Sequence, residues 1–239
     1  MTETADLAPN LGKIRPAEGF ATGFDATPAP AAVVRPKAVR VVVVGEFNSG
    51  KTTLVNALLG ASVLPASFTT HTAYPTVVRY AATPSLRAEI AQRRRIPFDW
   101  DQMDGAPTHQ ICRLHVGMPL DALRTLRAVD TPGLGLGDES LDARTLRSCR
   151  SADVIIWCTP AMQAWKASEQ RAWLSLPKAV RRRGILAVTF MDQLRCQSDA
   201  SRLLARLSVD VAPLFRRMVT ASARSVDPDL TAVLSDHRN

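Results

Sequence analysis

The chain has 239 residues, of which 46% are hydrophobic and 22% are charged. This composition is typical of a soluble globular protein with a sizeable core, and it excludes a fibrous or wholly disordered chain. The 30 lysines and arginines outnumber the 22 aspartates and glutamates, so the net charge is +8. That excess favours an anionic partner such as a nucleotide, a nucleic acid or an acidic membrane surface, or else reflects only a solvated basic surface.

The sequence carries no signal for secretion or membrane insertion. Its N-terminus, MTETADLAPN, is polar and acidic, without the basic and apolar regions of a signal peptide. No apolar run approaches the roughly 20 residues of a transmembrane helix. The four cysteines are scattered without CxxC spacing. We therefore expect a reduced, cytoplasmic protein without a disulfide framework or zinc site, with any contact to the inner membrane peripheral.

Composition divides the chain into three segments. Residues 1–36 are rich in Ala, Pro, Thr and Gly, and they are predicted to be disordered or extended. Residues 37–225 are predicted to form one ordered domain, and residues 226–239 a C-terminal helix or tail. The basic triplets Arg93–Arg95 and Arg181–Arg183 are interpreted as solvated or phospholipid-facing, so nucleic acid is not an expected partner.

Strands and helices alternate through the ordered segment. The continuously apolar stretch at 38–45 indicates a buried parallel strand, and the next helix, 51–60, ends at Gly60. Further strands are expected at 76–81, 126–130, 153–160, 184–190 and 217–222, with weaker ones at 86–92 and 112–119. Further helices are expected at 140–150, 166–176, 198–215 and 227–238. This alternation predicts a three-layer α/β fold, a mostly parallel sheet of about six strands flanked by helices.

The stretch GEFNSGKT between the first strand and helix matches the phosphate-binding pattern G-x-x-x-x-G-K-[ST]. Gly45 and Gly50 let the backbone curl so that its amides point at phosphate oxygens, and the helix adds its positive end. The ammonium of Lys51 reaches the β- and γ-phosphates, and the hydroxyl of Thr52 is a Mg²⁺ ligand. A chance glycine-rich turn is the alternative interpretation.

Two later motifs complete a nucleotide site. In VDTPG, at the end of an apolar strand, Asp130 is predicted to hold Mg²⁺ and the amide of Gly133 to contact the γ-phosphate. In TFMDQL, Asp192 is predicted to accept the two guanine hydrogen bonds that adenine cannot supply, with Thr189 in the first motif position. Phe190 replaces the usual lysine and is expected to pack against the base. The alternatives are an ordinary turn and a helix-capping aspartate.

The loop at 64–80 and the strand end at 220–224 carry weaker signals for nucleotide binding than the three motifs above. One loop threonine must bind Mg²⁺ and the γ-phosphate, and Thr69, Thr70 and Thr72 compete for that role. Ser222-Ala223 follows the last strand, where a backbone amide is expected to contact the guanine oxygen.

Taken in order, GEFNSGKTTLVNALLG, the Thr-rich loop ending in PTVVRY, VDTPGL and WKASEQ resemble the bacterial branch of the dynamin-like GTPases over roughly residues 37–225. The resemblance implies Thr72 as the switch I threonine and a GTPase domain that dimerises across its nucleotide face. Members that remodel membranes carry long helical stalks. The segments 1–36 and 226–239 leave no room for one, so we expect this chain to work with a stalk-bearing partner if it remodels membranes.

Catalysis is predicted to differ from that of Ras-like GTPases. The residue after the VDTPG motif is Leu134, which cannot orient water as a glutamine does. Asn48 resembles the asparagine that binds K⁺ in potassium-dependent GTPases, where the cation stabilises charge between the β- and γ-phosphates. A hydrogen bond within the loop is the alternative role for Asn48.

The predicted function is GTP binding and Mg²⁺-dependent hydrolysis to GDP and phosphate, stimulated by a dimer or partner. Lys51, Thr72 and Asn48 are the candidate catalytic residues, and Thr52, Thr72 and Asp130 the candidate metal ligands. The nucleotide is expected to contact Gly45, Glu46, Phe47, Asn48, Ser49, Gly50, Lys51, Thr52, Thr53, Thr72, Asp130, Gly133, Thr189, Asp192, Ser222 and Ala223. The competing hypotheses are a non-hydrolysing nucleotide-regulated binding module and, disfavoured by Asp192, an ATPase.

Overall fold

The computed structural model describes residues 38–65, 74–99, 111–194 and 196–222, together with Asp227, Leu230 and Leu234. The predicted disordered segment 1–36 lies outside these residues. So do Thr69, Thr70, Thr72 and Ala223, four residues with predicted roles at the nucleotide.

A single sheet of nine strands runs through the described part of the chain, in the order β4-β3-β5-β2-β6-β1-β7-β8-β9. The strands are β1 (Val39–Gly45), β2 (Thr76–Tyr80), β3 (Ser85–Ile90), β4 (Arg95–Pro97), β5 (Ile111–Met118), β6 (Leu126–Asp130), β7 (Val154–Pro160), β8 (Gly184–Thr189) and β9 (Arg217–Thr220). The five strands from β6 to β9 in this order are mutually parallel, whereas β2 is antiparallel to β6 and β3 is antiparallel to both its neighbours.

The predicted α/β class and the mostly parallel sheet are confirmed, but the expected number of about six strands is wrong. Strands β3, β4 and β5 form one edge of the sheet: β3 and β5 correspond to the weaker candidates at 86–92 and 112–119, and β4 was not predicted. In β3 and β4 most side chains are exposed or half-buried, so these strands lack the continuous apolar run that marks a central parallel strand. Strands β3 and β4 are recognised by their backbone pairing in the sheet and not by the hydrophobic pattern of their sequences.

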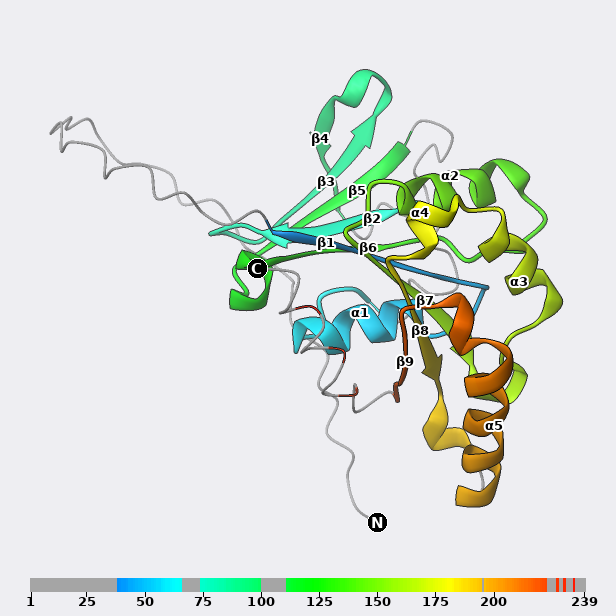
Figure 1. The fold of residues 1–239 in the computed structure, drawn as a ribbon. Helices are drawn as coiled ribbons and strands as arrows, with labels where there is room; N and C mark the ends of the chain where they lie inside the picture. The colour runs from blue at the N-terminus through cyan, green and yellow to red at the C-terminus, as the bar shows by residue number, and fades with distance from the viewer. Residues whose placement is uncertain are drawn as a thin grey trace, which may run out of the picture. The chain divides into compact units, whose positions relative to one another are not determined.

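Helices cover both faces of the sheet (Figure 1). They are α1 (Lys51–Leu59), α2 (Glu139–Cys149), α3 (Ala167–Leu174), α4 (Lys178–Arg181) and α5 (Gln197–Asp210). Helix α1 packs on one face, and α2, α3 and α5 pack on the other. None of the helices in the described ranges is both long enough and apolar enough to cross a membrane.

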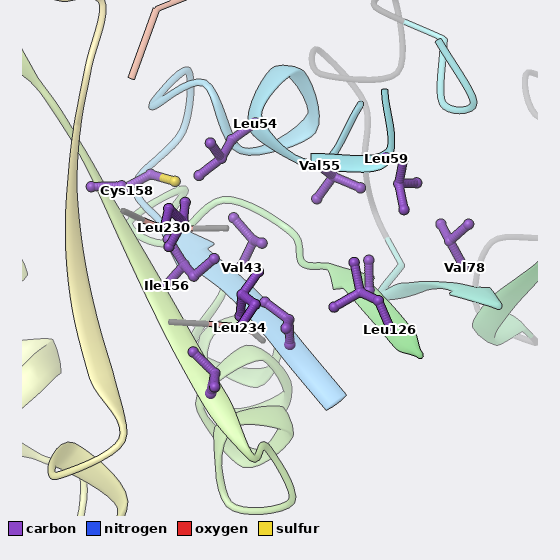
Figure 2. Packing of buried hydrophobic residues seen from close by; sticks show 14 of the residues in the cluster. Val43, Leu54, Val55, Leu59, Val78, Leu126, Ile156, Cys158, Leu230 and Leu234 are labelled. Carbon is purple, nitrogen blue, oxygen red and sulfur yellow. The ribbon is translucent and has the colours of Figure 1, made fainter. Parts of the chain in front are cut away.

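Strand β1 has its apolar character because it is buried on both faces. Val41 and Val43 belong to the core cluster beneath α1, whereas Val42 and Val44 belong to the cluster on the opposite face. Figure 2 shows Val43 and Ile156 on adjacent strands, facing Leu54 of α1. Burial of both faces therefore fixes β1 in the middle of the parallel part of the sheet.

Two residues near the C-terminus also belong to the core. Leu230 and Leu234 are both helical and are spaced one helical turn apart, and both are buried in the α1-side cluster (Figure 2). The C-terminal segment thus packs against the sheet at these two positions.

The helix ends follow from backbone chemistry. Helix α1 ends at Leu59, one residue before the predicted end, because Gly60 adopts the left-handed conformation with φ 65° and its amide bonds to the carbonyls of Asn56 and Ala57. Helix α5 was expected to reach residue 215 but ends at Asp210. Val211 leaves the helical conformation, and Pro213 lies in a short 3-10 turn, consistent with the missing amide hydrogen of proline.

Candidate functional site

The phosphate-binding loop joins the carboxyl end of β1 to the amino end of α1. Gly50 caps α1 with φ 79°, a left-handed conformation that a side chain would strain. Asn48 also has positive φ, 55°, and within the described residues its exposed side chain has no hydrogen-bond partner. The loop is therefore tightly wound, with the amides before α1 in the arrangement that binds anions.

Lys51 follows this loop as the first residue of α1 and is only 7% exposed. Its ammonium donates a hydrogen bond of 2.6 Å to the Glu46 carbonyl, and it lies 3.4 Å from Ser49 Oγ. Burial lowers the pKa of Lys51, and the charge of Asp130 only partly opposes this effect. A buried cation bonded to neutral acceptors favours an anionic ligand at this position.

Asp130 and Thr52 meet below the loop. The Thr52 hydroxyl donates to Asp130 Oδ2 over 2.6 Å, and both residues are buried. Burial raises the pKa of Asp130 to about 6, although the Thr52 bond and the charge of Lys51 lower it. The other carboxylate oxygen, Oδ1, is buried without a hydrogen-bond partner among the described residues.

A hydroxyl beside an unpartnered carboxylate oxygen is a suitable pair of ligands for Mg²⁺, which prefers oxygen and is usually held by one or two carboxylates in phosphate-transfer sites. Elsewhere in the described ranges there is no group of three or more His, Cys, Asp or Glu residues that could hold a metal ion. The Thr52 hydroxyl and the Asp130 carboxylate therefore have the chemistry of a Mg²⁺ ligand pair.

The loop after Asp130 is hydrogen-bonded to the phosphate-binding loop. The Leu134 amide donates to the Gly45 carbonyl over 3.1 Å, and the Phe47 amide donates to the Leu134 carbonyl over 3.3 Å. A Cβ atom on Gly133 would lie 2.7 Å from Phe47 Cα, so this close approach requires glycine. The Leu134 side chain is 5% exposed and packs into the core cluster on the α2 side of the sheet.

The base-recognition motif lies against the same loop. Thr189 Oγ1 donates to the Ser49 carbonyl over 2.9 Å, which connects the end of β8 to the phosphate-binding loop. Phe190 has φ 56°, and its ring lies 3.3 Å from where a Cβ of Gly50 would be. A small pocket is lined by Gly50, Thr53, Leu54, Thr189, Phe190, Ala221 and Ser222. Asp192 is exposed in the short turn Met191–Gln193 that follows.

The structure thus brings most of the predicted site residues together at the carboxyl ends of β1, β6, β8 and β9, as expected for a parallel α/β sheet. Thr53 lines the pocket beside Gly50, and Ser222 lines its other side. The Glu46 carboxylate is turned away from the loop interior. It accepts hydrogen bonds from the Lys166 ammonium, over 2.8 Å, and from the Ser168 hydroxyl of α3.

Sequence reasoning missed a buried carboxylate behind the site. Glu169 is 1% exposed and accepts hydrogen bonds from Trp157 Nε1, the Thr159 hydroxyl and the Lys166 amide. Burial raises its pKa, and these three donors oppose that effect. The Thr159 carbonyl in turn accepts from Thr189, so Glu169 connects the start of α3 to the base-recognition motif. The local signal was the K-x-x-E spacing, which lets the Glu169 carboxylate in the first turn of α3 accept the backbone amide of Lys166, the residue before the helix.

Comparison with known proteins identifies the family. The family model for the dynamin family matches residues 41–190. Dynamin-like protein 2 of Campylobacter jejuni is 33% identical over 143 residues, which are 57% of this chain and 23% of that protein. The isoniazid-induced protein IniC of Mycobacterium tuberculosis is 31% identical over 125 residues, 48% of this chain and 25% of that protein. The chain thus spans about a quarter of the length of these curated relatives.

Solved structures agree on the fold. A chain of an oligomerised bacterial dynamin pair, described as sensing and tethering membranes, has a TM-score of 0.61 and 24% identity, and the match covers 84% of this chain and 35% of that one. Era of Aquifex aeolicus, bound to GDP and AlF4⁻, has a TM-score of 0.50 and 18% identity, and the match covers 83% of this chain and 56% of that one. Because the family model covers more than half of the chain, the protein belongs to the dynamin family.

Proposed function

We propose that this chain binds GTP and hydrolyses it to GDP and phosphate with the help of Mg²⁺. The observation that carries this proposal is the pairing of Thr52 with Asp130 below the phosphate-binding loop, with Asp130 Oδ1 left without a partner among the described residues. A buried carboxylate oxygen with no donor is costly, and a metal ion would relieve that cost.

Different residues of the site would bind the phosphates and the metal ion. Lys51 and the amides of residues 45–51 would hold the phosphates, where the buried ammonium stabilises the charge that develops on the γ-phosphate. Thr52 and Asp130 would hold Mg²⁺, together with Thr72, which lies outside the described residues. The metal ion would neutralise negative charge on the β- and γ-phosphates.

Guanine would enter beside Phe190. Asp192 is exposed next to the pocket and would accept the two hydrogen bonds of the guanine edge, while Thr189 holds the motif against the Ser49 carbonyl. The amides of Ser222 and of Ala223, which lies outside the described residues, would contact the guanine oxygen. The Phe190 ring already covers Gly50, so it supports the floor of this pocket.

Truncating this ring gives a test of the pocket. Phe190→Ala is expected to weaken GDP binding about threefold to tenfold, because an aromatic contact contributes about 0.5–1.5 kcal/mol. Fluorescence titration with a labelled GDP measures the change. Phe190→Leu, which retains an apolar side chain, is the matched control and should lose less affinity. Equal GDP affinity of the wild-type and Phe190→Ala proteins would show that Phe190 does not contribute to nucleotide binding.

The attacking water would be positioned by backbone groups and a cation. Leu134 is buried and cannot orient water, so we propose that backbone groups of the loop at 64–80, the switch I loop, do so, with K⁺ held by Asn48, whose side chain has no hydrogen-bond partner among the described residues. Dimerisation across the nucleotide face, or docking on a stalk-bearing dynamin-like partner, would stimulate hydrolysis. The oligomerised pair among the structural neighbours supports this part of the proposal. We place the chain in the cytoplasm, in peripheral contact with the inner membrane.

Phosphate release separates this function from its alternative, a nucleotide-regulated module that does not hydrolyse. Release from GTP is measured with Mg²⁺ in K⁺ buffer and again in Na⁺ buffer, over a range of protein concentrations. We expect release that is faster in K⁺ and that rises more than linearly with protein concentration. Equal rates in both buffers would exclude Asn48 from catalysis. Tight GTP binding without phosphate release at any concentration would favour the non-hydrolysing module.

A further inference from the structure

A basic pocket of about 330 Å³ lies between strand β5 and helix α2. We call it the α2–β5 pocket. It is lined by Pro75, Cys112, Arg113, Arg144, Arg147, Ser148 and Ser151, none of which belongs to the nucleotide site described above. Three of its seven lining residues are arginines, and none is acidic.

Helix α2 supplies three of these side chains, and Ser151, in the turn two residues beyond its end, supplies a fourth. Arg144, Arg147 and Ser148 are spaced i, i+3 and i+4, so they fall on one face of the helix. The two hydroxyls now donate to carbonyls of the same helical segment, Ser148 to Arg144 and Ser151 to Ser148. Hydroxyls with such local bonds can turn to an incoming acceptor at small cost.

Strand β5 supplies Arg113 from the opposite wall. Its Nε is buried and has no hydrogen-bond partner among the described residues. Glu89 pairs with Arg113 in the β3–β5 register and attracts it, but the Glu89 carboxylate already accepts bonds from His115, at 2.7 Å, and from Arg95, at 3.5 Å. A buried donor without an acceptor favours an anionic ligand.

More arginines crowd the same face of the sheet. Arg40 lies two residues before Val42 on β1 and therefore on the same face of the sheet, the face that α2 covers, and Arg127 of β6 pairs with Arg40. Burial lowers the pKa of Arg40, and so do the nearby charges of Arg113 and Arg127, although Asp153 opposes them. Arg40 Nε is also buried without a partner among the described residues. The repulsion between these cations would be relieved by an anion bound against Arg113.

We propose that the α2–β5 pocket binds a phosphate group, carried either by a free polyphosphate anion or by an acidic lipid headgroup. Planar guanidinium groups converging from a helix and a strand suit an oxyanion that accepts several charge-assisted hydrogen bonds. The volume of about 330 Å³ suits a discrete group better than an extended polymer. This proposal does not depend on the chain being a GTPase.

Titration with inorganic tripolyphosphate tests the pocket. Because tripolyphosphate can also bind the phosphate-binding loop, calorimetry uses the Lys51→Ala protein, in which that loop lacks its ammonium. We expect binding at one site per chain. Adding Arg113→Ala or Arg147→Ala should weaken it about tenfold, because each removes a charged hydrogen-bond donor. Arg147 is exposed, so its variant should fold even if Arg113→Ala does not.

A matched variant and a second probe complete the experiment. Arg202→Ala removes an exposed arginine of α5, outside the pocket, and should change the affinity by less than about twofold. Sedimentation with phosphatidylglycerol–phosphatidylcholine vesicles tests the lipid source with the same variants. Binding of vesicles alone, lost in Arg147→Ala, indicates a headgroup, and binding of tripolyphosphate alone indicates a free anion. Binding of neither probe, or equal weakening by Arg202→Ala, would overturn the proposal.

Discussion

Replacing Lys51 by alanine is expected to reduce GTP hydrolysis at least about 10²-fold, the usual cost of losing one preorganised group that stabilises transition-state charge. Lys51 is nearly fully buried at the amino end of α1, and burial lowers its pKa. An anionic phosphate would therefore interact with it more strongly than with a lysine in water. The rate of phosphate release at saturating GTP measures the effect.

The matched control for Lys51→Ala is Lys178→Ala, which removes an exposed lysine of α4 and should leave hydrolysis unchanged. The Lys51 ammonium also bonds to the Glu46 carbonyl, so thermal unfolding should confirm that the variant is folded. A folded Lys51→Ala protein that hydrolyses GTP at the wild-type rate would show that this loop is not the catalytic site.

The second large effect is expected at Asp130. Asp130→Asn keeps the size of the side chain and the bond from Thr52 but removes the negative charge that Mg²⁺ requires. We expect hydrolysis to fall at least about 10²-fold, and nucleotide affinity to become insensitive to Mg²⁺. GDP titrations with and without EDTA, together with phosphate release, measure these changes. The exposed Asp210→Asn, at the end of α5, is the control.

The unfolding temperature of the Asp130→Asn protein shows whether the variant has lost metal binding or is misfolded. Without metal, burial of the Asp130 carboxylate opposes folding, as its pKa of about 6 indicates. A neutral asparagine avoids that cost, so the metal-free Asp130→Asn protein should unfold at the same temperature as wild type or higher. A variant that is inactive but clearly less stable would point instead to a structural role for Asp130.

The central fold was predictable because local pattern and tertiary position agree there. Strand β1 is apolar from Val41 to Val44 and is buried on both faces there, and α1 ends before a glycine in the left-handed conformation. The β3–β4–β5 edge was underestimated because most side chains of β3 and β4 are exposed or half-buried, so that antiparallel pairing rather than an apolar run makes them strands. The end of α5 was set five residues too late because the turn at Pro213 breaks a pattern that otherwise continues.

The site was predictable where its chemistry lies in a contiguous motif. The phosphate-binding loop and Asp130 have fixed spacing relative to their strands, so the sequence alone indicated that they meet. The contacts from Glu46 to Lys166 and from Thr189 to Ser49 join residues more than 100 positions apart. Such contacts depend on how loops pack at the carboxyl ends of the strands, so they cannot be predicted from a local sequence pattern.

Base selectivity offers the most direct test of the central claim, that the site beside Phe190 and Asp192 is built for GTP. The measurement compares kcat/KM for phosphate release from GTP and from ATP, in the same Mg²⁺ and K⁺ buffer. A site that hydrogen-bonds the guanine edge should favour GTP by at least about 10²-fold, because ATP would leave the Asp192 carboxylate unpaired. Equal values for the two nucleotides would contradict the proposed role of Asp192 and with it the proposed GTPase function.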